Sequence, residues 1–249
     1  MSRLNFETHG DAQQPAVLLL HGFMSCNGQW LANLEALSEH LFLITVELWG
    51  HGDSPMPSDA GQFSLPSYYE QFEQIRAELG VTTWAVIGQS YGAGIVLNYA
   101  RAFPEVCTAA VATNSRSAFG TMLEERERSG EANAAPPEDL RKLPFHPIHA
   151  RRFPPAIKDV LVAKADDMLP EAVRLSGRLG RDLNCRDKLA DLPVPLLITN
   201  GKYEKSFQRD LQTLREAIPE LNVVDLEGGH SVNIEAAEGF NETVLRFLR

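Results

Sequence analysis

The chain of 249 residues is short of basic side chains and of long apolar runs. Its 23 lysine and arginine residues face 33 aspartate and glutamate residues, which gives a net charge of −10. This acidic balance argues against nucleic-acid binding, because a phosphate backbone attracts basic surfaces. The longest apolar run, residues 16–20, is far shorter than the roughly 20 residues that cross a bilayer. We therefore expect neither nucleic acid nor a membrane as a partner.

Cysteine is also scarce, and the three that occur have no paired spacing: Cys26, Cys107 and Cys185. An odd number of scattered cysteines is typical of reduced thiols and indicates neither a disulfide framework nor a zinc site. The first residues lack the apolar stretch of a signal peptide. A cytoplasmic protein is the expectation, and a monomer and a homodimer are both left open.

Short apolar runs alternate with amphipathic patterns of helical period along most of the chain. The apolar runs predict strands at residues 4–8, 16–20, 41–46, 84–87, 109–113, 194–199 and 222–226. The amphipathic patterns predict helices at about residues 30–40, 67–79, 207–218 and 234–247, and another that starts at about residue 90. Nearly continuous apolar strands are typical of parallel sheets that helices cover on both faces. The sequence thus predicts an α/β fold with a doubly wound, mostly parallel sheet.

Residues 116–191 break this alternation. The stretch holds several helical patterns and many prolines but no convincing strand. Within it, residues 124–128 are highly charged and indicate a solvated helix face or hinge, and residues 134–137 indicate a break. We interpret the stretch as a helical cap inserted after a sheet strand, with residues 1–115 and 192–249 forming the core domain.

The sequence Gly-Gln-Ser-Tyr-Gly at residues 88–92 lies between a predicted strand and a predicted helix. Strand, sharp turn and helix are the context in which Gly-x-Ser-x-Gly presents a nucleophilic serine. The turn places the hydroxyl at a helix N-terminus, where the helix dipole favours developing negative charge. Ser90 is therefore the candidate nucleophile; the alternative is a glycine-rich turn with an incidental serine.

A serine nucleophile needs a base, and His230 is the best placed of the seven histidines. It follows the strand at residues 222–226 and the flexible pair Gly228-Gly229. That position lies at the carboxyl edge of the sheet, where catalytic groups of such folds gather.

The base in turn needs an orienting carboxylate, and Glu204 follows the strand at residues 194–199 at the same edge. Asp225 lies within a predicted strand and Asp210 within a predicted helix, so both are poorer candidates. The chain order Ser90, Glu204, His230 matches the order described for acyl-transfer enzymes of this architecture.

A loop begins with His21-Gly22-Phe23 directly after the strand at residues 16–20. The backbone N–H groups of Phe23 and Tyr91 would form an oxyanion hole. Candidates to line a substrate pocket are Met24, Trp49, Phe119 and Phe145.

Along nearly its whole length the chain resembles the α/β-hydrolase superfamily. The residues that carry the resemblance are His21-Gly22-Phe23, Gly50-His51-Gly52-Asp53-Ser54, the Ser90 turn, Glu204 and Gly229-His230. The resemblance implies a sheet of eight strands, or slightly fewer, with the cap over the active site. Two positions depart from the usual pattern, since Glu204 and Glu47 stand where aspartate is more common.

These parts together predict a serine carboxylesterase acting on small or medium esters. Ser90 would attack the ester carbonyl, His230 would take its proton, and Glu204 would stabilise the imidazolium. The reaction requires no cofactor. Activity is expected to fall as His230 is protonated, around its ordinary pKa of about 6.5.

Two other functions stay open. Phe207 and the segment His21-Gly22-Phe23-Met24 are similar to menaquinone-pathway lyases, which implies a lyase or carbon–carbon hydrolase with an acidic substrate. The arginines available to bind it would be Arg116, Arg126, Arg151 and Arg152. The Ser-Tyr-Gly turn departs from the Ser-Met-Gly usual in those lyases. The other possibility is a ligand receptor built on this fold. A metal site at His146 and His149 is disfavoured, because no acidic or cysteine partner lies near them in the sequence.

Overall fold

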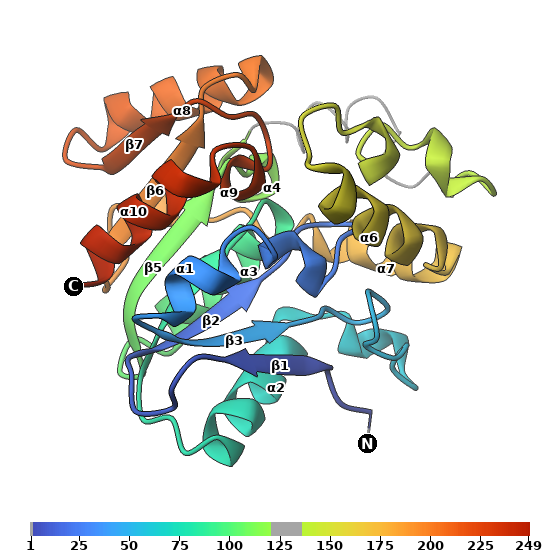
Figure 1. The fold of residues 1–249 in the computed structure, drawn as a ribbon, viewed down its shortest axis with the longest axis horizontal. Helices are drawn as coiled ribbons and strands as arrows, with labels where there is room; N and C mark the ends of the chain where they lie inside the picture. Colours follow the sequence, from blue (N-terminus) through green and yellow to red (C-terminus); the bar gives the residue numbers. More distant parts are fainter. Residues whose placement is uncertain (1, 121–135) are drawn as a thin grey trace.

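The computed structural model describes residues 2–120 and 136–249. Within these ranges, strands form one sheet in the order β1-β3-β2-β4-β5-β6-β7 (Figure 1). Their bounds are β1 (Phe6–His9), β2 (Ala16–Leu20), β3 (Phe42–Val46), β4 (Trp84–Gly88), β5 (Cys107–Thr113), β6 (Leu196–Gly201) and β7 (Asn222–Leu226). β1 pairs antiparallel with β3, and every other neighbouring pair is parallel. The predicted α/β fold with a mostly parallel sheet is confirmed.

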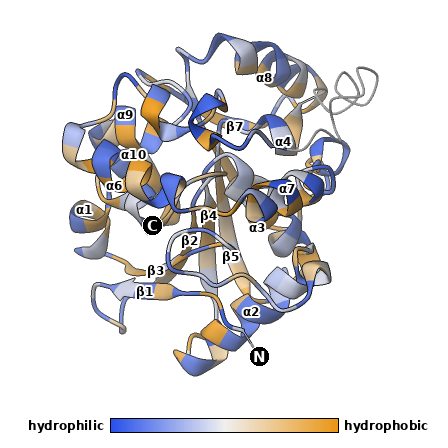
Figure 2. Cartoon of the chain, turned by 90° about the vertical axis from the view of Figure 1, so that its right-hand side faces the viewer, coloured by the Kyte–Doolittle hydropathy of each residue, from blue (hydrophilic) through white to orange (hydrophobic). Residues whose placement is uncertain are grey.

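Helices cover the sheet on both faces. They are α1 (Leu34–Ser38), α2 (Leu65–Glu78), α3 (Tyr91–Ala102), α4 (Arg116–Phe119), α6 (Pro155–Asp166), α7 (Pro170–Leu179), α8 (Lys205–Ala217), α9 (Val232–Glu235) and α10 (Ala237–Leu248). Short 3₁₀ turns are η1 (Asn27–Trp30), η2 (Ala60–Gln62), η4 (Leu140–Lys142), η5 (Pro147–His149) and η6 (Arg186–Lys188). In Figure 2, β2, β4 and β5 lie between helices that carry many hydrophilic residues on their outward sides.

Alternation along the central strands divides the core into two layers. In β2, Val17 and Leu19 pack in one cluster of buried residues, and Leu18 and Leu20 pack in another. The first cluster includes side chains of η1, α1 and α10, and the second includes side chains of α2, α3 and α8. Successive side chains of a strand point to opposite faces, so both faces of these strands must be apolar.

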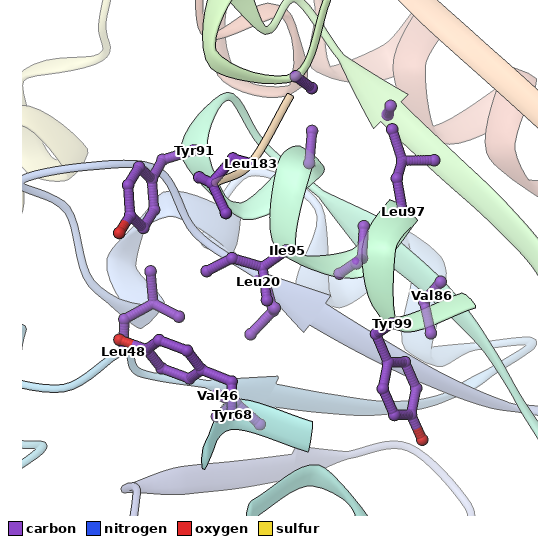
Figure 3. Packing of buried hydrophobic residues seen from close by; sticks show 14 of the residues in the cluster. Leu20, Val46, Leu48, Tyr68, Val86, Tyr91, Ile95, Leu97, Tyr99 and Leu183 are labelled. Atoms are coloured by element: carbon purple, nitrogen blue, oxygen red, sulfur yellow. The ribbon is translucent and has the colours of Figure 1, made fainter. Parts of the chain in front are cut away.

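The larger layer lies around α3, the helix that follows the candidate nucleophile. Figure 3 shows side chains of this layer, among them Leu20, Val46, Val86, Ile95, Leu97 and Tyr99. The Tyr99 ring meets the Phe72 ring edge-on at 5.4 Å and stacks on the Phe103 ring at 5.1 Å. This dense packing gives α3, and with it the turn at residue 90, a rigid support.

Two predicted helices are interrupted. The helix expected at residues 30–40 is divided into η1 and α1, and Asn33 between them turns its side chain toward Asn241 and the Asn233 carbonyl. The helix expected at residues 234–247 is divided into α9 and α10 at Ala236, whose φ of −133° is not helical. β6 begins at Leu196 because Pro195 has no N–H to donate to the sheet.

Between β5 and β6, the described residues form helices and 3₁₀ turns and no strand. α6 and α7 lie on the side toward which the arrows of β2 and β3 point (Figure 1). The prediction for residues 124–128 lies outside the described residues, and the division of the chain into core and cap stays an interpretation. No helix in the described ranges has the length and apolar character needed to span a bilayer.

Candidate active site

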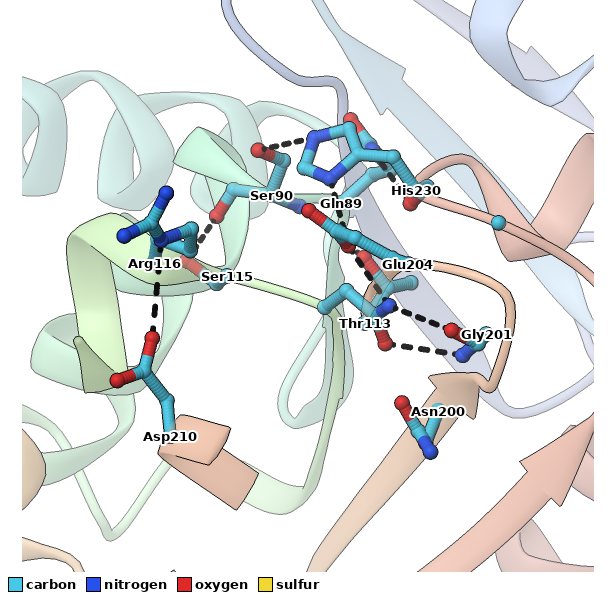
Figure 4. A network of polar contacts seen from close by, with 12 residues as sticks. Gln89, Ser90, Thr113, Ser115, Arg116, Asn200, Gly201, Glu204, Asp210 and His230 are labelled. Carbon is cyan, nitrogen blue, oxygen red and sulfur yellow. Dashed lines mark hydrogen bonds and ion pairs between the residues drawn. The ribbon is translucent and has the colours of Figure 1, made fainter. Parts of the chain in front are cut away.

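Ser90 lies in the turn between β4 and α3 with φ of 50° and ψ of −108°. Among the described residues other than glycine, Met24 is its only companion with positive φ. The strained backbone is held by two contacts from the adjoining strand end (Figure 4). The Ser90 N–H donates to Thr113 Oγ1 at 3.1 Å, and Ser115 Oγ donates to the Ser90 carbonyl at 2.6 Å. Strain that the surroundings maintain is a common property of functional sites.

Gly92 lets this turn lie close to β2. A Cβ atom at residue 92 would lie 2.5 Å from the His21 carbonyl oxygen and 2.6 Å from the Leu20 carbonyl oxygen. Real Cβ atoms do not approach backbone oxygens so closely, so any other residue would push the turn away from β2. The second glycine of the motif therefore brings the nucleophile next to the loop that follows β2.

His230 and Glu204 complete a line of hydrogen bonds with Ser90 (Figure 4). His230 Nε2 lies 2.8 Å from Ser90 Oγ, and His230 Nδ1 lies 3.0 Å from Glu204 Oε2. An ionised carboxylate only accepts hydrogen bonds, so Nδ1 carries the ring hydrogen and Nε2 is free to accept the serine proton. The structure thus brings together the three predicted residues in the arrangement that general-base activation of a serine requires.

The two charged partners alter each other's pKa. Desolvation alone would lower the pKa of His230, but attraction to Glu204 and the hydrogen bond to it outweigh desolvation and raise the pKa above 6.5. Burial would raise the pKa of Glu204, but the charge of His230 and hydrogen bonds from His230 and Asn114 lower it below its ordinary value. Glu204 is therefore ionised at neutral pH and stabilises a positive charge on the imidazole.

Asn114 is a residue of this site that the sequence analysis missed. It follows β5, and its Nδ2 donates to Glu204 Oε2 at 2.8 Å and to the Gly201 carbonyl at 3.0 Å. Its Oδ1 accepts from the Gly201 N–H at 2.9 Å. The available signal was a polar side chain at the carboxyl end of a buried strand, the edge from which the triad was predicted.

The predicted oxyanion-hole residues both lie beside Ser90. Tyr91 is the first residue of α3, so its N–H has no acceptor within the helix. Phe23 lies in the loop after β2, and its ring is 5.7 Å from the Tyr91 ring. His21 supports this loop, since its Nε2 accepts from the Leu48 N–H at 3.0 Å. Burial lowers the pKa of His21 to about 4, and its Nε2 is already occupied by the Leu48 N–H, so His21 is a poor candidate for a second general base.

A cavity of about 1040 Å³ opens over Ser90, His230 and Glu204. Of the four predicted pocket residues, Met24 and Phe145 line it. The prediction for Trp49 and Phe119 is wrong, because both are completely buried and neither is among the described residues that line the cavity. They lie in the large core layer, and the Phe119 ring packs 6.2 Å from the Phe207 ring. Aromatic side chains at turns after strands serve the core as readily as a pocket, and the sequence alone does not separate the two.

The other candidates for catalytic or metal-binding roles have contacts of their own. Asp225 pairs with Arg215 at 3.1 Å, and Asp210 lies 3.7 Å from Arg116. Burial raises the pKa of the Cys26 thiol to about 11, which makes it a poor nucleophile. His146 and His149 both line the cavity, and within the described ranges no three side chains of His, Cys, Asp or Glu gather as a metal site.

Comparison with known proteins agrees with this architecture. The sequence profile of the alpha/beta hydrolase fold matches residues 15–155, and the chain therefore belongs to the α/β-hydrolase fold family. The chain is 23% identical to "Putative 2-succinyl-6-hydroxy-2,4-cyclohexadiene-1-carboxylate synthase" of Bacillus subtilis, over 96% of this chain and 92% of that protein. It is 26% identical to "Putative carbamate hydrolase RutD" of Agrobacterium fabrum, over 98% of each chain. A solved hydrolase structure from Pseudomonas aeruginosa shares the fold with a TM-score of 0.80 and 22% identity, over 98% of this chain and 94% of that one.

Proposed function

We propose that the chain is a serine hydrolase that cleaves small or medium carboxylic esters through an acyl-enzyme. The observation that carries the proposal is the line of contacts from Ser90 Oγ through His230 to Glu204 at the floor of an open cavity. Membership of a family with hydrolase relatives supports the reaction type. The cavity of about 1040 Å³ is at the upper end of the roughly 300–1,000 Å³ usual for small-molecule sites, so it has room for small and medium esters.

The mechanism follows from the positions of the three side chains. His230 Nε2 takes the Ser90 proton as Ser90 Oγ attacks the ester carbonyl, and Glu204 stabilises the imidazolium. The N–H groups of Phe23 and Tyr91 hold the tetrahedral oxyanion, and His230 then protonates the departing alcohol. Water attacks the acyl-enzyme by the same route and restores the serine.

Hydrolysis of p-nitrophenyl esters of increasing acyl length tests this proposal. The wild-type protein is expected to turn over short and medium esters, and Ser90→Ala is expected to lose at least about 10³-fold in kcat because the nucleophile is gone. Equal rates in both proteins would exclude Ser90 as the nucleophile.

A lyase reaction on the same triad is the second candidate. It is favoured by the similarity to the Bacillus subtilis synthase over nearly the whole chain and by Arg116 in the cavity lining. A fluorophosphonate that labels Ser90 separates the candidates when combined with the ester assay. Labelling with ester turnover supports the hydrolase, and labelling without ester turnover favours the lyase. One acylation burst followed by no turnover would instead favour a ligand receptor.

A further inference from the structure

A second carboxylate, Glu235, lies beside the proposed base. Glu235 ends α9, its side chain is only 9% exposed, and it lines the same cavity as Ser90 and His230. Its Oε2 accepts the N–H of Gly229, the residue directly before His230, at 2.9 Å. The carboxylate thus binds the backbone of the loop that carries the imidazole, and the mechanism above gives it no role.

The backbone at residue 229 lies close to this carboxylate. A Cβ atom there would lie 2.9 Å and 3.0 Å from the two carboxylate oxygens of Glu235, and 3.3 Å from Arg152 Nη1. A side chain at residue 229 would therefore displace the carboxylate, the arginine, or both. The loop is tied to α9 by the hydrogen bond from the Gly229 N–H to Glu235.

Arg152 also contacts Glu235. It lies just before α6, in the region between β5 and β6 that the sequence analysis interpreted as an inserted cap, called the inserted region below. Its Nη1 lies 3.4 Å from Glu235 Oε2, and its guanidinium lies over the Tyr203 ring at 4.7 Å from the ring centre. Tyr203 precedes Glu204, and its N–H donates to the Gly228 carbonyl at 2.9 Å. Arg152 thus contacts the residue before the proposed acid directly, and it reaches the loop that carries the proposed base through Glu235.

Resting on the proposed function, we infer that Glu235 is a positioning residue for His230 and that Arg152 tunes it by docking the inserted region onto this carboxylate. Glu235 holds the loop through Gly229 and adds a negative charge near the imidazole. Arg152 partly neutralises that charge and joins the two loops. The proton affinity of the His230 imidazole therefore depends on whether Arg152 of the inserted region is in contact with Glu235.

The charges around His230 determine in which direction each substitution should shift its pKa. Glu204 raises the pKa of His230 most among the raising interactions, and Glu235 raises it further. Arg116 lowers the pKa of Glu204 from the far side of that carboxylate. The other titratable side chains among the described residues that line the cavity are Tyr91, Arg174, Arg178, Arg181, His146 and His149. Removing the charge of Glu235 should therefore make His230 easier to deprotonate, and removing Arg152 should make it harder.

The test is the titration of His230 by NMR, together with the pH profile of kcat/KM. Glu235→Gln keeps an oxygen to accept the Gly229 N–H but loses the charge, and it should lower the His230 midpoint by about half a pH unit. Arg152→Gln should raise the midpoint by a similar amount. Glu238→Gln is the matched control, because Glu238 is an exposed acid in the first turn of α10, and the midpoint should not move.

The inference predicts shifts of opposite sign for the two substitutions, which a general loss of structure would not produce. Thermal unfolding shows whether each variant folds. Identical midpoints in the wild type, Glu235→Gln and Arg152→Gln would overturn the inference, as would shifts of the same sign. If no ester is hydrolysed, the proposed function fails, but the NMR titration of His230 still tests the role of Glu235.

Discussion

Ser90 combines the hydroxyl proposed as the nucleophile with a backbone conformation that residues other than glycine disfavour. The contacts from Thr113 and Ser115 and the close packing at Gly92 keep it there. Such strain costs on the order of 1–3 kcal/mol and is offset by the packing of α3.

This strain predicts that Ser90→Gly is more stable than Ser90→Ala. Both variants lose the hydroxyl, but glycine adopts positive φ without a steric cost. Relief of the backbone strain should outweigh the entropy cost of ordering glycine on folding. The free energy of unfolding of Ser90→Gly should therefore exceed that of Ser90→Ala by about 1 kcal/mol. Urea unfolding of both variants measures it, and an alanine variant as stable as the glycine variant would show that residue 90 stores no strain.

The raised pKa of His230 predicts the acid limb of the activity. The base works only when neutral, so kcat/KM should fall as pH drops through an inflection above 6.5, higher than an ordinary histidine would give. Glu204→Gln removes the main source of the shift and should move the inflection downward while lowering kcat by roughly 10²- to 10⁴-fold. A pH–rate series on both proteins checks this; an inflection that stays in place would argue against Glu204 as the triad acid.

At the scale of elements, buried amides tie η1 to α9 and α10. Gln29 Nε2 donates to Asn233 Oδ1 at 3.0 Å, and Asn233 Nδ2 donates back to the Gln29 carbonyl at 2.8 Å. Asn33 Nδ2 donates to the Asn233 carbonyl at 2.9 Å and to Asn241 Oδ1 at 2.8 Å. The network joins the segment after the loop that begins at His21 to the segment that follows His230.

Asn233→Ala is expected to destabilise the fold by about 3 kcal/mol, because buried donors and acceptors lose their partners where water does not replace them. Asn222→Ala, at an exposed position of β7, is the control and should change stability by less than about 0.5 kcal/mol. Thermal and urea unfolding measure both. An equal, small loss in the two variants would mean that water reaches the network.

The sheet, and the three side chains that meet at its edge, could be predicted because both have local signals in the sequence. Apolar runs mark the central strands, and Ser90 and Glu204 follow two of them, while His230 follows the edge strand β7. The breaks at Asn33 and Ala236 were not predictable, since they depend on partners roughly 200 residues away in sequence for Asn33 and on packing for Ala236. The pocket was predicted only in part. Met24 and Phe145 line the cavity, whereas Trp49 and Phe119 pack into the core. Residue type alone does not show in which direction the backbone points each side chain.

At the scale of the whole molecule, we expect two buried histidines to make the fold sensitive to acid. Burial lowers the pKa of His21 to about 4 and that of His51 to about 3, and the two rings are 5.3 Å apart. The unfolded chain binds protons at these residues near pH 6.5, before the folded protein does. Their contribution to stability is therefore present above pH 6.5 and is lost as pH falls from 6.5 toward 3, by an amount on the order of 5 kcal/mol for the pair.

The urea midpoint should consequently drop between pH 7.5 and pH 4.5, and His51→Gln should show a shallower drop. His40→Gln is the control, since His40 is exposed, and should follow the wild-type curve. Parallel curves for all three proteins would assign the acid sensitivity to other groups.

Ser90, Asn114, Glu204 and His230 follow β4, β5, β6 and β7, so the last strand of the sheet is needed before the line of contacts exists. A nascent chain in which residues 222–230 are still inside the ribosomal tunnel has Ser90 without its histidine, by the order of synthesis alone. During refolding, hydrolytic activity should therefore return only after β7 has paired with β6. The rate at which activity returns would then measure the rate of the last step in forming the sheet.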